Sequence, residues 1–543
     1  MSSPLIRASL VSLPLAVVSV SQAADSKPTV LPKVQVEATV EEGYRTETAQ
    51  SAKTDTPLRD VPQSISVITR QTLDDLNTQN IGEAMQYVPG VSMAQGEGNR
   101  ETPVIRGNST TGDFFLDGMR DDVQYYRDLY NVQQVEVLKG PNGALFGRGG
   151  VGGLINRVSK QPVFDPVRSV SLQLGSFENR RITADFGQAL TDSIAFRING
   201  VYEDSESYRD DVTLERYGIN PTVTFRAGDR TTVTAGVEYF HDERTADRGV
   251  SSFLGRPLET RRGEFFGDPD QSPVEATVRM ANLLVEHRFS DDVVLRNRTR
   301  YSDYDKFYQN VFAGAVNTTP VGGNPAGTLV SLVAYNNATQ RENFFNQTDL
   351  NFTLTTGAVT HKLLAGIELG RQDTENFRNT GYFDTVAPGT TSIQVPVGDP
   401  RTTLPVSFRQ SATDADNDGT AKIAAVYLHD EIALSPQFLL VAGFRYDSFE
   451  VDFTNRRTGT DFSSDDDLFS PRLALVYKPI ENVSAYASYS LTYQPRAGDQ
   501  LSSLSATNSS LDPEEFVNYE VGVKWDAKPD LAVTVALFEL ERR

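Results

Sequence analysis

The residues with the clearest potential for binding chemistry lie between residues 135 and 160, in the stretch VEVLKGPNGALFGRGGVGGLINRVSK. Gly147, Gly149 and Gly152 have the spacing G-x-G-x-x-G, which cradles a pyrophosphate when it lies between a strand and a helix. The residues that follow, LINRVS, have the composition of a second strand rather than a helix, so a nucleotide site is not predicted. The glycines instead indicate tight turns and close backbone approach.

Metal and nucleophile chemistry have few candidate residues. The chain has no cysteine, which removes disulfides, thiolate metal sites and cysteine nucleophiles. Asp414, Asp416, Asp418 and Gly419 match the first half of a calcium-binding loop, but Ala425 stands where a bidentate glutamate is required, so we expect only an acidic loop. The histidines are scattered and expected to be structural: His241, His287, His361 and His429. No nucleophile elbow, P-loop or histidine pair supports an enzyme.

The N-terminus has the features of an export signal. Arg7 supplies a basic start, residues 8–20 an apolar core and residues 21–23 a small-residue cleavage pattern, so residues 1–23 are predicted to be a signal peptide. No later apolar run reaches about 18 residues, so no membrane-spanning helix is predicted. A net charge of -21 argues against a nucleic-acid partner. The exported chain is therefore either soluble or a membrane barrel.

From about Asp165 onward, polar and apolar residues alternate in segments typical of β-strands. Residues 483–494 are one example. In another, Val293, Leu295 and Tyr301 share an apolar face opposite three arginines, Arg296, Arg298 and Arg300. This periodicity fits both a soluble sandwich, where the apolar face packs on another sheet, and an outer-membrane barrel, where it meets lipid.

The connections between these segments separate the two alternatives. Short links are predicted near residues 191–193, 228–229, 290–292, 356–357, 435–437, 479–482 and 528–530, and long links near residues 245–273, 309–340, 377–419 and 497–513. A strict alternation of short and long links puts all the long loops at one end, as in barrels with short periplasmic turns and long extracellular loops. We therefore predict an all-β transmembrane barrel.

The number of predicted strands is roughly fifteen, which is odd, whereas single-chain bacterial barrels have even numbers. The last segment, residues 531–543, has no later strand to pair with. Because plugged outer-membrane transporters have about 22 strands, we infer a barrel of that class that is incomplete at the C-terminus. A miscount of one or two strands is the alternative.

Three blocks ahead of the barrel resemble, in the same order, the plug domain of TonB-dependent siderophore receptors. They are DTPLRDVPQSISVITRQTLDDLNTQNIGEAMQYVPGV, then VIRGNSTTGDFFLDGMR, then the glycine-rich stretch. The resemblance implies an N-terminal α/β plug in the barrel lumen, with a short helix from Thr72 to Met85. It divides the chain into a periplasmic arm over residues 24–53, the plug over residues 54–162 and the barrel over residues 163–543.

Residues 32–38, PKVQVEA, resemble a TonB box, the segment that the inner-membrane protein TonB grips. A short alternating stretch in a polar arm can add as a strand to the sheet edge of a partner. The predicted box comprises Val34, Gln35, Val36, Glu37 and Ala38. An ordinary disordered linker is the alternative. The resemblance thus implies TonB, with its inner-membrane energising complex, as a partner.

The resemblance also places loops of the plug at the extracellular side, where a ligand binds. Arg100, Tyr125, Tyr126 and Arg127 are the predicted ligand contacts, because aromatic rings stack on catechol rings and arginine matches anionic oxygens. Ordinary surface contacts, or contacts between plug and barrel, are the alternative for each. The three arginines at positions 296, 298 and 300 are expected to add cations along the ligand path.

Arg106 and Glu520 resemble family positions that join the plug to the barrel wall by an ion pair, and we expect them to latch the plug. Independent solvated charges are the alternative. Siderophores carry their own iron ligands, so no metal site and no cofactor is expected in the protein.

The function implied is active, TonB-dependent transport of a ferric siderophore, of catecholate type, across the bacterial outer membrane by a monomeric integral barrel in contact with outer-membrane lipid. The alternatives are uptake of haem, cobalamin or another chelate by the same mechanism, or a passive or adhesive barrel.

Overall fold

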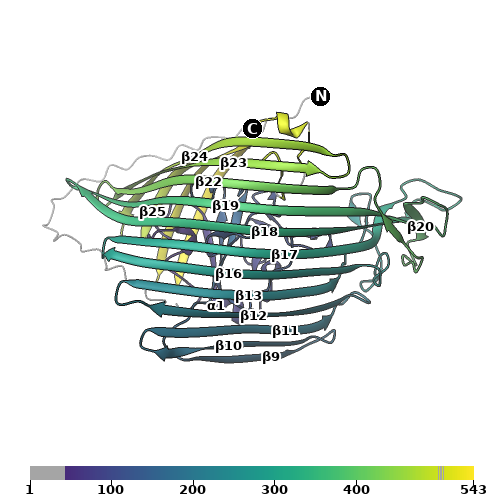
Figure 1. Ribbon diagram of the computed structural model, residues 1–543, viewed down its shortest axis with the longest axis horizontal. Helices are drawn as coiled ribbons and strands as arrows, with labels where there is room; N and C mark the ends of the chain where they lie inside the picture. Colours follow the sequence, from purple (N-terminus) through teal and green to yellow (C-terminus); the bar gives the residue numbers. More distant parts are fainter. Residues whose placement is uncertain (1–42, 499, 502–503, 506) are drawn as a thin grey trace. The chain divides into compact units, whose positions relative to one another are not determined.

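Long antiparallel strands make up most of the chain in the computed structural model, which describes residues 43–498, 500–501, 504–505 and 507–543. The predicted signal peptide and TonB box lie outside the described residues. Figure 1 shows the long strands side by side. They are β9 (Val167–Leu174), β10 (Arg180–Thr191), β11 (Ile194–Glu206), β12 (Thr213–Arg226), β13 (Thr231–Thr245), β16 (Pro273–Ser290), β17 (Val293–Val316), β18 (Leu329–Thr356), β19 (Val359–Tyr382), β22 (Asp416–Ala433), β23 (Phe438–Asn455), β24 (Thr460–Ile480), β25 (Val483–Gln494), β26 (Glu514–Lys528) and β27 (Leu531–Arg542).

These strands form one sheet that is closed into a barrel. In the strand order, β27 is next to β9. Two short strands of a long loop, β20 (Ser392–Pro396) and β21 (Ser407–Arg409), pair onto β18 and β19. The loop between β13 and β16 contains a small hairpin of β14 (Ser252–Phe253) and β15 (Arg256–Pro257), and the loop between β25 and β26 contains the 3-10 turn η3 (Asn508–Ser510). The predicted all-β barrel is confirmed.

Alternation along each strand separates a polar lumen from an apolar exterior. In β11 the side chains of Arg197, Asn199 and Glu203 are buried inside the barrel, whereas Ile198 and Tyr202 are exposed on the outside. The predicted faces of β17 are also found, because Arg300 is buried and Tyr301 is exposed. The exposed apolar side chains form the surface that contacts lipid.

All seven predicted short turns are present, but the predicted strict alternation is wrong in detail. Connections at the opposite end are also short at residues 175–179, 207–212 and 456–459. The loop expected at residues 309–340 is largely strand, since β17 and β18 stay paired as far as Val316 and Val330. β18 has 28 residues, far more than the roughly 9–11 that cross a bilayer, so this hairpin extends beyond the membrane.

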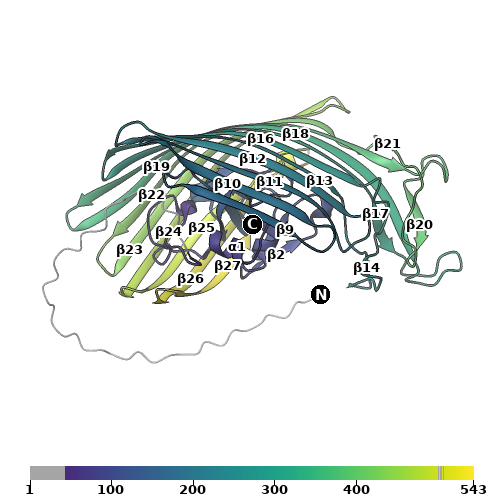
Figure 2. The same ribbon diagram turned by 90° about the horizontal axis from the view of Figure 1, so that it is seen from below.

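The plug lies on the concave side of the barrel sheet (Figure 2). Its main sheet has the order β1-β7-β8-β5-β6, and β2-β3-β4 form a second sheet. The elements are η1 (Gln50–Ala52), β1 (Ile65–Thr69), α1 (Arg70–Asp75), α2 (Ile81–Met85), β2 (Val91–Ala94), η2 (Gly96–Gly98), β3 (Thr102–Ile105), β4 (Asn108–Ser109), β5 (Phe114–Leu116), β6 (Met119–Arg120), β7 (Val132–Lys139), α3 (Gly143–Phe146) and β8 (Gly153–Ser159). A core that includes Leu73, Ile81, Phe114, Val135 and Ile155 holds sheet and helices together.

Two short helices replace the single helix predicted from Thr72 to Met85. Asn77 has a φ of +50°, a left-handed conformation that ends α1. Asn80 then caps α2, because its side chain accepts a hydrogen bond from the backbone N–H of Glu83.

The glycine-rich stretch packs against its neighbours and is followed by strand β8, as predicted. A Cβ atom at Gly152 would overlap the carbonyl oxygen of Ile105, so only glycine fits there. Gly149 has a φ of +77° and packs on the carboxylate of Asp113. Within the described part of the chain, no helix is long and apolar enough to cross a membrane.

Candidate functional site

The connection between β2 and β3 brings a carboxylate of the plug to the loop end of the barrel. Three donors converge on the carboxylate of Glu97: Arg100 Nη1 at 2.6 Å, Arg248 Nη2 at 3.0 Å and the hydroxyl of Tyr335 at 3.2 Å. Arg100 belongs to the plug, Arg248 to the loop between β13 and β16, and Tyr335 to β18. We call Glu97, Arg100, Arg248 and Tyr335 the apical cluster.

Aromatic rings and guanidinium groups stack beside this cluster. The guanidinium of Arg248 lies 3.8 Å from the ring centre of Phe312, and that of Arg378 lies 4.0 Å from the ring of Tyr335. Tyr308 packs edge-on against Tyr335 with ring centres 5.5 Å apart. Flat rings and planar cations of this kind can hold a ligand that is both aromatic and anionic.

The charged side chains of the apical cluster are partly open to solvent. The side chains of Glu97, Arg100 and Arg248 are about one fifth to one third exposed, so solvent reaches them. Burial by itself would raise the pKa of the Glu97 carboxyl, but the hydrogen bond from Arg100 and the charges of Arg100 and Arg248 hold that pKa below its usual value. Arg100 and Arg248 both pair with Glu97, and Arg378 lies 3.4 Å from a carboxylate oxygen of Asp414.

The structure places the four predicted ligand contacts in different environments. Arg100 lies in the apical cluster. Tyr126 is half-buried, with the guanidinium of Arg244 3.8 Å from its ring centre. Tyr125 and Arg127 are buried, at 4% and 1% exposure, so a ligand cannot reach them in this conformation. Arg100 and Tyr126 are the two predicted contacts that keep exposed surface in this conformation.

Tyr125 and Arg127 instead hold a buried carboxylate of the plug. Asp121 accepts hydrogen bonds from Arg127 Nε at 3.0 Å, from the Tyr125 hydroxyl at 3.0 Å and from the Tyr304 hydroxyl of β17 at 2.8 Å, and it also pairs with Arg157. Burial would raise the pKa of Asp121, but the charges of Arg127 and Arg157 lower it to about 2. Asp121 is thus a permanently charged contact between plug and wall.

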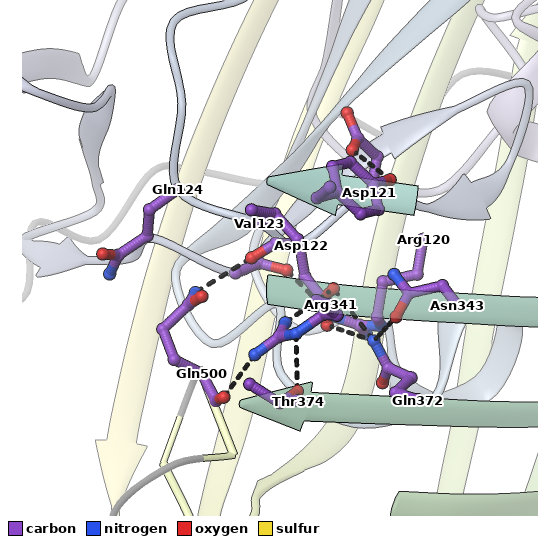
Figure 3. Close-up of polar contacts among 12 residues, drawn as sticks. Arg120, Asp121, Asp122, Val123, Gln124, Arg341, Asn343, Gln372, Thr374 and Gln500 are labelled. Atoms are coloured by element: carbon purple, nitrogen blue, oxygen red, sulfur yellow. Dashed lines mark hydrogen bonds and ion pairs between the residues drawn. The ribbon is translucent and has the colours of Figure 1, made fainter. Parts of the chain in front are cut away.

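The next residue, Asp122, joins the plug to two barrel strands and one loop (Figure 3). Its carboxylate accepts from Arg341 of β18 at 3.2 Å, from Gln372 of β19 at 3.0 Å and from Arg148 of the plug at 3.4 Å. Its backbone carbonyl accepts from the Gln500 side chain at 2.9 Å, and Arg341 donates to the backbone carbonyl of Gln500. Asp122 and Arg341 are each 1% exposed as side chains, so this contact excludes water.

Arg106 and Glu520 form the ion pair expected of a plug–barrel contact, and both side chains are buried. Arg106 also donates to Asn518 at 3.2 Å. Glu520 accepts from the backbone N–H of Ser64 at 2.9 Å and from the Tyr486 hydroxyl at 2.6 Å. Its carboxylate therefore connects two segments of the plug to β25 and β26.

The three arginines of β17 do not form a free cationic path. Arg296 pairs with Glu286 at 2.7 Å, and Arg298 lies 3.7 Å from a carboxylate oxygen of Asp349. Arg300 donates to the backbone carbonyl of Leu116 in the plug at 3.0 Å. Their charges mainly hold neighbouring strands and the plug in place.

Residues 43–61, which we call the collar, cross the turn end of the barrel and include the first residues of the predicted plug. Residues 43–53 belong to the predicted arm, yet in the structure they contact the plug and the barrel wall. Lys53 donates to the carbonyl of Leu145 in α3 at 2.8 Å, and burial lowers the pKa of its ammonium group to about 8. Thr54 donates to Glu431 of β22 at 2.9 Å, and Thr56 donates to the other oxygen of that carboxylate. Further collar contacts are Arg45 and Arg59 with Asp526, Asp55 with Lys362, and Asp60 with Lys478 and Ser484.

Glu136, a fully buried carboxylate of β7, connects the collar to the plug sheet. Its oxygens accept from the backbone N–H groups of Gln50 and Ser51 at 2.7 and 2.8 Å, and from Asn156 of β8 at 2.9 Å. If the collar left, this buried charge would lose two donors, which is costly. Displacement of the collar would therefore destabilise the plug.

Sequence reasoning missed Arg248, Tyr335 and Arg378 as members of the site. Arg248 and Arg378 lie in or beside stretches expected to be loops, and no spacing links them to Glu97. The sequence does show arginine and tyrosine residues near predicted loops, which is a weak signal for a ligand site. Which of these residues lie close together depends on how the strands pair. Within the described residues, no group of three or more histidine or acidic side chains is arranged to hold a metal ion.

Comparison with known proteins identifies relatives of both regions. The TonB-dependent receptor plug domain matches residues 57–154, and the TonB-dependent receptor-like β-barrel matches residues 224–543. The probable TonB-dependent siderophore receptor PiuA of Acinetobacter baumannii is 28% identical over 568 residues, which cover 98% of this chain and 76% of that protein. The crystal structure of the siderophore receptor PiuA from Acinetobacter baumannii has a TM-score of 0.82 at 27% identity and covers 92% of this chain and 75% of that one. The closed form of the ferric-catecholate import receptor Fiu from Escherichia coli K12 has a TM-score of 0.81 at 25% identity. The match covers 92% of this chain and 76% of that one.

Proposed function

The chain belongs to the TonB-dependent receptors, and from that premise we propose that it takes up a ferric catecholate siderophore through the apical cluster. It is an integral barrel of the bacterial outer membrane that transports ferric siderophores. The observation that carries the ligand class is the stacking of Arg248 and Arg378 on aromatic rings beside a solvent-accessible arginine, Arg100. The relatives named for siderophores, and for catecholates in the case of Fiu, support the same class.

Arg100 and Arg248 in the apical cluster can attract an anionic ligand to a protein that is acidic as a whole. A chain with a net charge of -21 repels a ferric catecholate at long range, whereas local cations attract it within about 10 Å at ordinary salt. The iron arrives inside its chelate, so the protein needs no metal ligands of its own. We assign no catalytic step and no cofactor to the protein, and we propose that it acts as a monomer.

We propose that the predicted domains have separate roles in transport. Residues 24–53 form the arm and the start of the collar, residues 54–162 the plug and residues 163–543 the barrel. The family matches at residues 57–154 and 224–543 support this division. TonB grips Val34 to Ala38 and pulls, the collar leaves the barrel wall, and the loss of donors to Glu136 loosens the plug sheet. The Arg106–Glu520 ion pair acts as a latch that holds the plug until then.

Replacement of Val36 by proline tests the coupling step. Proline fixes φ and removes a backbone donor, so residues 34–38 can no longer add as a strand to TonB. We expect uptake of a ferric catecholate by iron-starved cells to fall to the level of cells that lack TonB, while binding to the cell surface persists. Uptake of radiolabelled iron and binding in the cold measure the two steps separately.

Replacement of Val40 by proline is the matched control, because it makes the same change in the arm outside the box. This variant should keep both binding and uptake. Equal loss of binding and uptake in the Val36→Pro variant would indicate misfolding, and full uptake by that variant would refute the assignment of the box.

A further inference from the structure

The carboxylate of Glu97 occupies the position in the apical cluster where cationic and hydroxyl donors converge. Each of its oxygens is engaged: Oε1 accepts from Arg248, and Oε2 accepts from Arg100 and Tyr335. Charge-assisted hydrogen bonds of this kind are the ones that anionic oxygens of a ligand would make. The plug thus supplies an anion of its own to the cationic site.

The donors around Glu97 are only partly satisfied by it. Arg100 uses Nη1 for the carboxylate, whereas its buried Nε has no hydrogen-bond partner among the described residues. The guanidinium of Arg248 divides its donors between Glu97 and the hydroxyl of Tyr335, at 3.0 Å each. A ligand with several anionic oxygens can satisfy more of these N–H groups than one carboxylate does.

The backbone of Glu97 is held in an uncommon conformation. Its φ of +57° lies in the left-handed region, which is unfavourable for a residue other than glycine. The three donors to its side chain favour this arrangement. Loss of these donors to a competing anion would let the backbone of residues 96–98 relax.

From these observations we propose that Glu97 is a built-in placeholder that anionic oxygens of the ligand displace. The proposal rests on the proposed function, since it names how the same site selects its ligand. A ferric catecholate, which carries high negative charge, competes with the carboxylate for Arg100 and Arg248. A neutral chelate cannot replace a carboxylate as the partner of two guanidinium groups, so Glu97 discriminates against neutral ligands.

Displacement of Glu97 also changes a contact between plug and barrel. Gln95 donates to the backbone carbonyl of Asp247, and a Cβ atom at Gly98 would lie 2.6 Å from that same oxygen, so residues 95–98 pack tightly on the loop that carries Arg248. When Glu97 gives up Arg248, the ion pair between the plug and this loop is lost. Ligand binding at the site thereby weakens a contact between the plug and the barrel.

Titration calorimetry on purified receptor tests the placeholder with two variants. The probes are a ferric tris-catecholate and a neutral ferric tris-hydroxamate. Glu97→Gln keeps the size of the side chain and removes its charge, and Glu97→Ala removes the group. Both variants should bind the catecholate more tightly, by about tenfold for Glu97→Gln, which corresponds to about 1.4 kcal/mol. The gain should shrink at high salt, because the competition is electrostatic.

Glu259→Gln is the matched control, since it removes the same charge from an exposed residue of the loop that carries Arg248. It should leave the affinity unchanged. Unchanged or weaker catecholate binding by both Glu97 variants, with normal binding by the wild type, would overturn the placeholder alone. Failure of the wild type to bind the catecholate would refute the proposed ligand class, and the placeholder with it.

Discussion

A reducible cross-link between cysteines that replace Thr54 and Glu431 should abolish siderophore uptake and leave ligand binding intact. These two side chains are in hydrogen-bonding contact at 2.9 Å, one on the collar and one on β22. A covalent bond there anchors the chain at residue 54, so a pull on the arm cannot pass beyond this point and the plug stays closed. Because the chain has no cysteine, the introduced pair is the only reactive one.

The control is the same protein after reduction, in which uptake should return. Treated variants with one cysteine each should transport like their untreated forms. Full uptake by the cross-linked protein would show that the collar need not leave the wall at residue 54, and would contradict the proposed path of the pull.

Replacement of Asp122 by alanine should loosen the plug within the barrel. The change leaves the buried guanidiniums of Arg341 and Arg148 without their carboxylate, and breaking a buried pair in this way costs about 3–5 kcal/mol. We expect faster tryptic cleavage of the plug and a lower temperature for its unfolding, measured by calorimetry of the receptor in detergent.

Asp373→Asn provides the comparison, because Asp373 pairs with Arg371 where both side chains are about half exposed. An exposed pair contributes at most about 1 kcal/mol, so this variant should behave like the wild type. Equal protease resistance of the Asp122→Ala variant and the wild type would contradict the role given to the Asp122 network.

The barrel was predictable from sequence because its strands follow local patterns, and the plug because three blocks of sequence resemble a known family. Alternation identified strands such as β25, and turn residues such as Asp291, Asp292 and Gly357 marked the ends where strands reverse. The ends of β17 and β18 were not predictable. The residues of these two strands that extend beyond the membrane are polar, as loop residues are. They form strands only because β17 and β18 pair with each other.

The ligand site could be predicted only in part, for a physical reason. Arg100 and Arg127 have the same side chain and lie in neighbouring loops, yet one is open to solvent and the other is 1% exposed. The difference depends on Asp121, which turns Arg127 inward, and on Glu97, which holds Arg100 at the surface. Partners that come from barrel strands, such as Tyr304 for Asp121, become visible only once the chain is folded.

Uptake of radioactive iron, supplied as a ferric tris-catecholate, tests the central claim most directly. The measurement uses iron-starved cells whose other siderophore receptors have been deleted and which express this protein with or without TonB. We predict accumulation of iron only when both the receptor and TonB are present, and suppression by excess unlabelled ferric catecholate but not by a neutral ferric hydroxamate. Equal accumulation without TonB, or uptake of the hydroxamate alone, would contradict the account.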